Sequence, residues 1–318
     1  MDFALVIGRS VGCPADPITS FRKLHDKGYT DCRFIFEARF TLLPMLVRTA
    51  TLIALMLSIV GCATNPVTGR SQFMIISEKQ AISASSEAYV KMLAPLDEKG
   101  KIDSDPAQAA RVNQITARLI AQAIKFRPET QNWDWRVKVI DDPETVNAFC
   151  MAGGKMAIYS GLILKLETSD DEIAQVMGHE IAHALSAHTA EQMSVALATD
   201  LAVTAFAVTR DEPGVALAGA SLAAALAIKL PNSRIAEAES DVIGIELAAR
   251  AGYNPNAAVS LWEKMAKNSG SNGEFDFFST HPAPAKRIDN LRKLVPKMMP
   301  YYLEKGTRPV YPLKSGEG

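Results

Sequence analysis

The sequence predicts an α+β protein that is mostly helical, with a small antiparallel or mixed sheet beside its central helix. Three observations predict this class. Several long stretches repeat apolar residues at helical spacing and begin with capping signals. The region 135–160 instead contains short strand-like segments around a glycine pair. Hydrophobic residues make up 48% of the 318 residues, which is enough apolar surface for one substantial core.

The N-terminal stretch "MLVRTATLIALMLSIVGC", residues 45–62, has the order of a bacterial lipoprotein signal. A single positive charge, Arg48, precedes an apolar run from about Ala50 to Val60, and small residues then lead to Cys62. This run is shorter than the roughly 20 residues needed to cross a hydrocarbon core about 30 Å thick. A cleaved signal is therefore favoured over the alternative, an uncleaved membrane anchor.

We accordingly predict a signal peptide at residues 45–61 and a lipid attached to Cys62. Residues 1–44 remain unassigned, and we interpret them as an over-extended start in front of Met45. The residue after the lipidated cysteine is Ala63 and not aspartate. If the protein is a Gram-negative lipoprotein, as this resemblance implies, it is transferred to the outer membrane and faces the periplasm.

The mature chain is expected to begin with the lipidated cysteine and a polar tether at residues 62–76, which includes "NPVTGRSQ". The main domain is expected at 77–298. A tail rich in proline, glycine and lysine, 299–318, is predicted to be loosely held. The charges are balanced, with 34 basic and 35 acidic residues, so a nucleic-acid partner is not predicted.

The four cysteines, Cys13, Cys32, Cys62 and Cys150, show no metal-type spacing. After the predicted processing, Cys150 is the only free thiol, so no intramolecular disulfide can form even in an oxidising compartment. We expect Cys150 to be a small buried hydrophobe rather than a redox sensor.

Two helices are expected at the beginning of the domain. Ser77 and Gln80 form a capping-box pattern that begins a helix reaching about Leu93. A second helix is predicted from about Pro106 to Lys125 by the spacing of its apolar residues. Three strand-like segments follow, Trp135–Asp141, Val146–Met151 and Lys155–Ser160, with Gly153 and Gly154 at a turn.

The next helix begins at another capping box, Ser169 with Glu172, and we expect it to end near Gln192. Its predicted buried side consists of Ile173, Val176, Met177, Ile181, Ala184 and Leu185. An alanine-rich helical hairpin, Leu197–Leu230, is interpreted as closely packed helices, with contact to a bilayer or a partner as the alternative. The remaining helices are predicted around Ala236–Ala251, Pro255–Lys267 and Pro282–Val295.

The helix after Ser169 carries the motif H-E-x-x-H. Positions i and i+4 share one helix face, so His179 and His183 can aim their nitrogens at one metal ion, at about 2.0–2.1 Å each. Glu180 lies beside that face and can hold a water against the metal, as a metal-assisted hydrolase requires. The surrounding helix is apolar, where these polar groups would be costly without a metal.

A third ligand is needed, and the chain offers two places to look. In the metzincin pattern, a glycine and a third histidine follow, but here Ser186 and Thr189 stand at those positions. His188 is one residue short of the ligand position and rotated away from the metal face. The metzincin interpretation therefore fails, and we expect His188 to be a helix-surface or cap residue.

The other place is the later helix "SRIAEAESDVIGIELAARAGYNP", where Glu237 and Asp241 stand four residues apart on one face. Glu237 can coordinate the metal, and Asp241 can accept a hydrogen bond from the second nitrogen of a ligand histidine. Glu239 lies well round the helix, and we expect it to face solvent.

The segments "HEIAH", "SRIAEAESD" and "STHPAPAKRIDNLR", with "NAFCMAGGKMAIYSGLI" upstream, resemble the gluzincins of metallopeptidase family forty-eight. With the lipoprotein signal and "NPVTG", the chain is similar to the periplasmic branch of this family, the BepA- and LoiP-like lipoproteins. The resemblance covers about Asn65 to Val295. It implies a zinc metalloprotease domain of the gluzincin type.

Carried onto this sequence, the resemblance implies that His179, His183 and Glu237 bind one zinc ion. It implies that Glu180 is the general base and that Asp241 supports a ligand histidine.

The resemblance further implies that His281 either stabilises the oxyanion or occupies a fourth zinc position, and that Arg287 supports the ligands. An extended substrate would pair with the edge of the predicted strand at Asn147, Ala148 and Phe149, backbone to backbone.

The predicted function is a zinc-dependent metalloendopeptidase, anchored on the periplasmic side of the outer membrane, that hydrolyses misfolded or unassembled envelope proteins. An alternative is a chaperone-like or scaffolding lipoprotein whose zinc site is largely inhibited by His281. Zinc as a purely structural element is disfavoured, because structural sites rarely carry an uncoordinated glutamate such as Glu180 next to a ligand.

Overall fold

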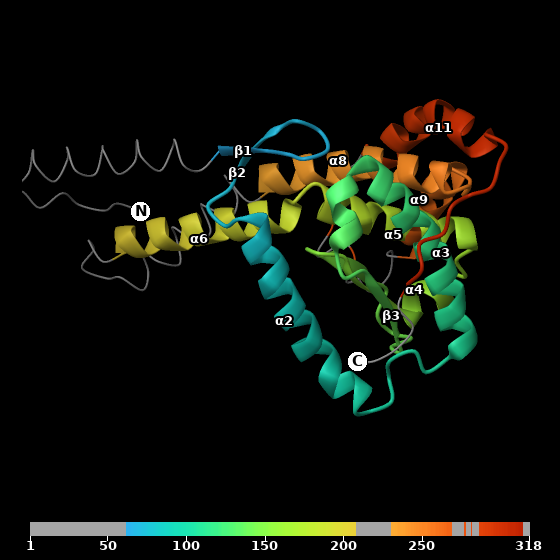
Figure 1. Ribbon diagram of the computed structural model, residues 1–318, viewed down its shortest axis with the longest axis horizontal. Coiled ribbons are helices and arrows are strands. Elements are labelled where there is room, and N and C mark those ends of the chain that lie inside the picture. Colours follow the sequence, from blue (N-terminus) through green and yellow to red (C-terminus); the bar gives the residue numbers. More distant parts are fainter. Residues whose placement is uncertain (1–61, 208–229, 269–276, 278–280, 282–285, 314–318) are drawn as a thin grey trace, which may run out of the picture. The chain divides into compact units, whose positions relative to one another are not determined.

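A computed structural model describes residues 62–207, 230–268, 277, 281 and 286–313 of the chain (Figure 1). The predicted signal peptide and the residues before it, 1–61, lie outside this part, and so does most of the alanine-rich hairpin, at 208–229. In the described ranges, no helix combines the length and hydropathy that crossing a membrane requires.

Helices dominate the described chain. They are α2 (Glu78–Asp97), α3 (Pro106–Phe126), α4 (Ser160–Leu164), α5 (Asp170–Leu185), α6 (His188–Ala207), α8 (Leu230–Arg250), α9 (Asn256–Asn268) and α11 (Arg287–Leu303), with a 3-10 turn at Pro128–Asn132. The strands are β1 (Cys62–Thr64), β2 (Ser71–Phe73), β3 (Arg136–Ile140), β4 (Ala148–Met151) and β5 (Lys155–Tyr159). The predicted fold class, mostly helical with a small sheet, is confirmed.

The strands form two separate sheets. β1 and β2 pair antiparallel, with Cys62 opposite Phe73. The other sheet has the order β3-β5-β4, in which β3 runs parallel to β5 and β4 runs antiparallel to it. This sheet is mixed, as predicted, and β4 lies at one of its edges.

The helix starts follow local signals in the sequence. Ser77 Oγ accepts from the Gln80 N–H at 3.3 Å, and Gln80 Oε1 accepts from the Ser77 N–H at 2.9 Å, which confirms the predicted capping box of α2. Asp105 caps α3, where its side chain accepts from two backbone N–H groups of the first turn. Pro106 then occupies the first helical turn, where its missing N–H costs nothing.

The predicted glycine turn joins β4 to β5. Gly153 and Gly154 have φ angles of 81° and 80°, in the left-handed region that favours glycine. A Cβ on Gly154 would lie 2.5 Å from the Trp135 ring, and one on Gly153 would lie 2.8 Å from Ile82. Both the backbone conformation and the surrounding space therefore require glycine here.

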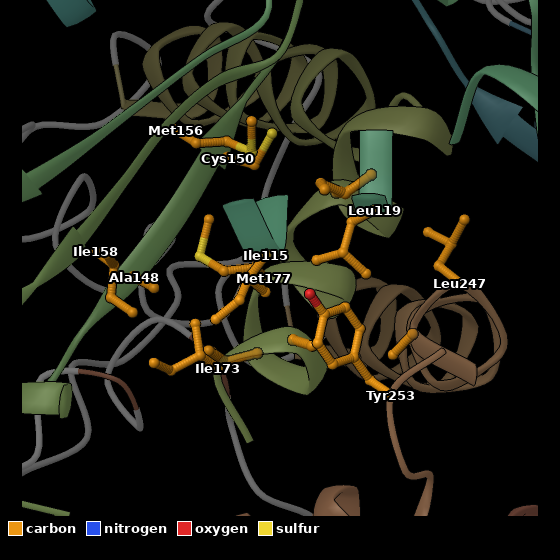
Figure 2. Close-up of a cluster of buried hydrophobic side chains, with 14 of the residues drawn as sticks. Ile115, Leu119, Ala148, Cys150, Met156, Ile158, Ile173, Met177, Leu247 and Tyr253 are labelled. Atoms are coloured by element: carbon orange, nitrogen blue, oxygen red, sulfur yellow. The ribbon is translucent and has the colours of Figure 1, made fainter. Parts of the chain in front are cut away.

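Helix α5 is the centre of the core. Every residue from Glu172 to Leu185 is buried, so the helix is enclosed on all sides rather than on one predicted face. Its start at the Ser169–Glu172 capping box is as predicted. α5 packs against α3, β4, α8 and α9. Figure 2 shows this core, with labelled side chains Ile115, Leu119, Ala148, Cys150, Met156, Ile158, Ile173, Met177, Leu247 and Tyr253. Cys150 is buried, as expected.

The end of α5 differs from the prediction. The helix ends at Leu185 and not near Gln192, and a new helix, α6, begins at His188. Between them Ala187 adopts a φ of 53°, which breaks the helical hydrogen-bond pattern. The guanidinium of Arg127 donates to the Leu185 carbonyl at 2.9 Å and so satisfies the terminal oxygen of α5.

The polar segment after β1 is not a free tether. Its Asn65 and Gln72 are buried. Asn65 Oδ1 accepts from the N–H groups of Val67 and Thr68, and Gln72 Nε2 donates to the Ser186 carbonyl at 2.9 Å. The prediction of a polar tether that stands apart from the domain is wrong for residues 65–72, because polar groups of the domain bind their side chains.

The predicted looseness of the tail is also wrong as far as residue 313. Arg308 donates to the carbonyls of Tyr301, Tyr302 and Glu304 at the end of α11. Further on, the Tyr311 N–H donates to the Ala117 carbonyl at 3.0 Å, and the side chains of Tyr311 and Leu313 pack on the core.

The contact between α5 and α8, which lie side by side in Figure 1, is unusually close. A Cβ added to Gly178 of α5 would lie 2.8 Å from the Gly244 carbonyl oxygen of α8. A Cβ added to Gly244 would lie 2.7 Å from the backbone nitrogen of His179. Because the opposing atoms are backbone, neither side can yield without moving a helix.

We therefore predict that Gly244→Ala lowers the free energy of unfolding by about 1–3 kcal/mol through overpacking. Replacing glycine by alanine inside a helix ordinarily stabilises the protein by about 1 kcal/mol. A loss of stability would therefore show that the space at Gly244 is too small for a methyl group. Denaturant unfolding measures it, with Ser83→Ala on the exposed face of α2 as the control. A more stable Gly244→Ala protein would contradict the close backbone contact.

Candidate metal centre

The two histidines of the motif point to one place on α5. The Nε2 atoms of His179 and His183 lie 3.1 Å apart, and both residues are buried. Their rings meet edge to face with centroids 4.8 Å apart. The two rings therefore converge as their helical spacing predicts, and they do so within the core rather than on the surface.

Glu237 comes to the same place from α8. Its carboxylate oxygens lie 3.3 Å from Nε2 of His179 and 3.3 Å from Nε2 of His183. His281 also reaches this point, with Nδ1 3.0 Å from Glu237 Oε1. One potential ligand atom from each of the four residues lies within 4.8 Å of the others.

This group fits a zinc ion. Bond lengths of about 2.0–2.1 Å place neighbouring ligand atoms of a tetrahedral zinc site about 3.3 Å apart. The observed spacings of 3.1 and 3.3 Å among His179, His183 and Glu237 match that edge. Two imidazoles and one carboxylate are also the donor set of catalytic zinc sites, which keep a position for water or substrate.

The protonation states of two predicted ligands suit a metal. Burial lowers the pKa of His183 well below its usual value, so this ring is neutral. For Glu237, burial favours the protonated acid, but hydrogen bonds from His179, His183 and His281 outweigh it and lower the pKa. A neutral imidazole and a carboxylate are the forms that coordinate metals.

The surroundings of His179 favour a positive charge at this site. Burial and the nearby Arg287 oppose protonation of its ring, yet hydrogen bonds with Asp241 and Glu237 raise the pKa to about 9. The two carboxylates thus create a negative potential centred on the imidazole group. A divalent cation bound by the three ligands would occupy that potential.

Glu180 is the carboxylate that remains free to act. Its Oε1 is buried and accepts no hydrogen bond from any residue that the structure describes. His281 Nε2 lies 3.4 Å from this oxygen. Burial raises the pKa of Glu180, which moves it toward the range of a general base near neutral pH.

Asp241 and Arg287 lie behind the predicted ligands. Asp241 Oδ1 is 3.2 Å from His179 Nδ1, the nitrogen that faces away from His183. Arg287 donates to Asp241 through Nε at 3.1 Å and to Glu237 Oε2 through Nη1 at 2.8 Å. The guanidinium also lies over the Trp262 ring, 3.8 Å from its centroid.

His281 is held by an aromatic residue that the sequence analysis missed. Phe277 stacks on the His281 ring, with centroids 4.5 Å apart and an interplanar angle of 22°. The Phe277 N–H donates to the Val146 carbonyl at 3.2 Å. Since Val146 lies two residues before β4, this bond places the beginning of the sheet edge beside the metal group. The only sequence signal was the four-residue spacing between Phe277 and His281.

The residues predicted to pair with substrate lie where the edge strand β4 begins: Asn147 directly precedes it, and Ala148 and Phe149 are its first two residues. On its inner side this strand pairs with β5, where Ala148 is opposite Ile158 and the Asn147 carbonyl accepts from the Tyr159 N–H at 3.0 Å. Pairing of these three residues with a substrate stays a prediction.

Two expectations about polar residues near the motif are wrong. His188 is buried at 1% exposure instead of lying on the surface, with Nδ1 3.0 Å from His183 Nδ1. Glu239 does not face solvent, because it lies 2.9 Å from His188 Nε2 and accepts from Arg70. Burial opposes ionisation of Glu239, but hydrogen bonds from His188, Arg70 and Thr68 lower its pKa to about 2.

The comparisons with known proteins agree with this geometry. The family model for peptidase family M48 matches residues 106–295, more than half of the chain. The mitochondrial metalloendopeptidase OMA1 of Saccharomyces cerevisiae is 31% identical over 251 residues, which cover 74% of this chain and 70% of that protein.

Two bacterial proteins are similar as well. The metalloprotease LoiP of Escherichia coli is 32% identical over 215 residues, covering 65% of this chain and 81% of LoiP. The "Putative beta-barrel assembly-enhancing protease" of Vibrio cholerae is 30% identical over 224 residues, covering 65% of this chain but 42% of that protein. The family match and the buried His/Glu group together show that the chain belongs to peptidase family M48 and is a metalloprotease.

Proposed function

We propose that this metalloprotease is a zinc-dependent endopeptidase of the bacterial envelope. We further propose that it is anchored to the outer membrane through a lipid on Cys62 and degrades misfolded or unassembled envelope proteins. The observation that carries the catalytic part concerns Glu180. This buried carboxylate has an oxygen that accepts no hydrogen bond from the described residues, and it lies beside three residues that can hold one metal ion.

His179, His183 and Glu237 would hold the zinc ion. When bound there, zinc would polarise a carbonyl group and lower the pKa of a water molecule to about 7. Asp241 would accept a hydrogen bond from Nδ1–H of His179. This bond keeps the proton on Nδ1 and leaves Nε2 free for the metal. Arg287 would hold Asp241 and Glu237 in place through its hydrogen bonds to both.

Glu180 would be the general base and then the general acid. It takes a proton from the attacking water while the water oxygen forms a bond with the carbonyl carbon of the scissile peptide. Glu180 then gives this proton to the leaving nitrogen as the C–N bond breaks. His281, 3.4 Å from Glu180, would stabilise the negative charge on the carbonyl oxygen.

An extended substrate would add to the outer edge of β4, along Asn147, Ala148 and Phe149. Backbone pairing along an edge strand is available only to chains that are locally unfolded. It depends little on side-chain identity, since the hydrogen bonds come from the main chain. Such recognition supports misfolded or unassembled proteins as the substrate class.

The envelope location rests on two arguments. The stretch that ends at Cys62 has the order of a lipoprotein signal. The name of the Vibrio cholerae relative also links proteolysis to the assembly of β-barrels.

A second candidate function is supported by the position of His281. Its Nδ1 lies 3.0 Å from Glu237 Oε1 and belongs to the group that can hold the metal. As a fourth ligand, His281 would fill the position that a catalytic site keeps for water. The protein would then act mainly as a chaperone-like or scaffolding lipoprotein with little turnover.

We predict that Glu180→Gln lowers kcat for casein by about 10²–10⁴-fold, which is the usual contribution of general acid–base catalysis. Zinc content should not change, because Glu180 is not among the proposed ligands. Metal analysis and a degradation assay measure the two effects. Glu246→Gln, which removes a charge from the surface pair with Arg250, serves as the control. Full turnover by Glu180→Gln would refute the mechanism.

Removal of the metal should abolish proteolysis reversibly. A chelator is expected to stop casein degradation, and added Zn²⁺ should restore it. Glu237→Gln should weaken zinc binding by more than the roughly 10–100-fold that follows loss of an outer hydrogen-bond partner. Competition with a chromophoric chelator measures this affinity. Unchanged zinc affinity in Glu237→Gln would remove Glu237 from the proposed ligand set.

His281→Ala separates the two candidate functions. If His281 stabilises the oxyanion, as the peptidase proposal states, we expect kcat to fall by about 10²–10³-fold, as for other oxyanion donors. A rise in activity would instead show that His281 blocks the metal and would favour the second candidate. Steady-state kinetics on casein and on an unfolded porin distinguish the two results.

A further inference from the structure

A second cluster of polar side chains, most of them buried or half-buried, lies directly behind the metal group. It joins three parts of the chain that are far apart in sequence: the hairpin β1–β2, the start of α6 and the first half of α8. Its members are Asn65, Thr68, Arg70, Gln72, His188, Glu191, Glu239 and Ser240. None of them is a proposed metal ligand.

His188 connects this cluster to the metal group through its two ring nitrogens. Nδ1 lies 3.0 Å from His183 Nδ1, and Nε2 lies 2.9 Å from Glu239 Oε2. The Ser240 hydroxyl is a weaker neighbour, 3.4 Å from His188 Nδ1. The His188 ring thus stands between a predicted metal ligand and a carboxylate.

The hydrogen bonds allow only one arrangement of protons when His183 binds a metal through Nε2. Its Nδ1 then carries the proton and must donate, because a neutral imidazole has one donor and one acceptor nitrogen. The neighbouring atom, His188 Nδ1, must therefore accept. That places the proton of His188 on Nε2, where it is donated to Glu239.

Glu239 is itself held at the far end of this chain. Arg70 donates to its two oxygens through Nε and Nη2, both at 3.0 Å, and Thr68 Oγ1 donates at 2.6 Å. Arg70 also pairs with Glu191 through Nη1 at 2.9 Å and Nη2 at 2.7 Å. The carboxylate is therefore fixed in position by the hairpin and cannot turn away from His188.

We propose that His188, oriented by Glu239, is a positioning residue that fixes the tautomer and the ring orientation of the metal ligand His183. It does for His183 what Asp241 does directly for His179, through one additional imidazole. The inference rests on the proposed function in one respect, namely that His183 binds the metal. It adds that the hairpin residue Arg70 belongs to the support of the metal centre.

A simpler interpretation is that the cluster only fastens the hairpin to α6 and α8. That role would affect stability, and it would leave the affinity of the folded protein for metal unchanged. Metal affinity is therefore the quantity that separates the two interpretations, measured on folded protein with Zn²⁺ or Co²⁺ as the probe.

The test compares His188→Leu with His188→Asn in the full chain. Leucine removes both hydrogen bonds, and we expect the dissociation constant for Zn²⁺ to rise by about 10–100-fold. The asparagine Oδ1 stands near the position of Nδ1 and can still accept from His183, so this variant should recover most of the affinity. The absorption spectrum of the Co²⁺-loaded protein should change in His188→Leu and remain close to wild type in His188→Asn.

Ser194→Ala is the matched control. Ser194 is buried on the same helix, and its Oγ accepts from the N–H groups of Ile75 and Ile76 at 3.0 and 2.9 Å. Its loss weakens the attachment of the segment after β2 without touching His183. We expect a lower melting temperature and an unchanged Zn²⁺ affinity. Glu239→Gln provides a second variant that is independent of His188, with an expected smaller loss of affinity.

The inference is overturned if folded His188→Leu and Glu239→Gln bind Zn²⁺ as tightly as wild type, whatever happens to their melting temperatures. Failure of the proposed function gives a different result. In that case the wild-type protein, like His183→Ala, binds no Zn²⁺ in the same competition assay, and the inference falls together with the metal site.

Discussion

The metal group depends on the backbone contact between α5 and α8. Glu237 belongs to a helix that begins far along the chain from His179 and His183, and it reaches them only because the two helices touch at Gly178 and Gly244. Helices usually pack with axes about 8–10 Å apart, a separation set by their side chains. Here the absence of side chains on both sides of the contact brings the α8 carboxylate within 3.3 Å of both imidazoles.

This contact also places the charges inside the core, where each of them requires a partner. Two supporting systems supply partners on different sides of the imidazole pair. Asp241 and Arg287 support His179 and Glu237, whereas His188 and Glu239 stand behind His183. Since an unpaired buried charge costs several kcal/mol, the ligands and their supports form one unit. Within the described residues, Glu180 Oε1 accepts no hydrogen bond, although it lies 3.4 Å from His281 Nε2.

The sequence predicted the parts of this fold that have local causes. Capping boxes, the glycine turn and the four-residue spacings of His179 with His183 and of Glu237 with Asp241 are short patterns that the structure retains. The errors had distant causes. The end of α5 depends on Arg127, 58 residues earlier, whose guanidinium binds the Leu185 carbonyl. Continuing the helix to Gln192 rotated His188 away from the metal, which hid its contact with His183.

Glu239 was misplaced for a related reason, and the cause shows how the hairpin contributes to the site. On an isolated helix, Glu239 faces away from Glu237 and Asp241, and solvent is the natural environment for a carboxylate there. The hairpin covers this face because Arg70 brings a positive charge that both Glu239 and Glu191 require. Its polar composition, which suggests a tether, is what a segment needs if it folds onto buried charges instead of an apolar surface. The segment that follows Cys62 is therefore part of the protease domain, and its docking and the order of the metal centre depend on the same ion pairs.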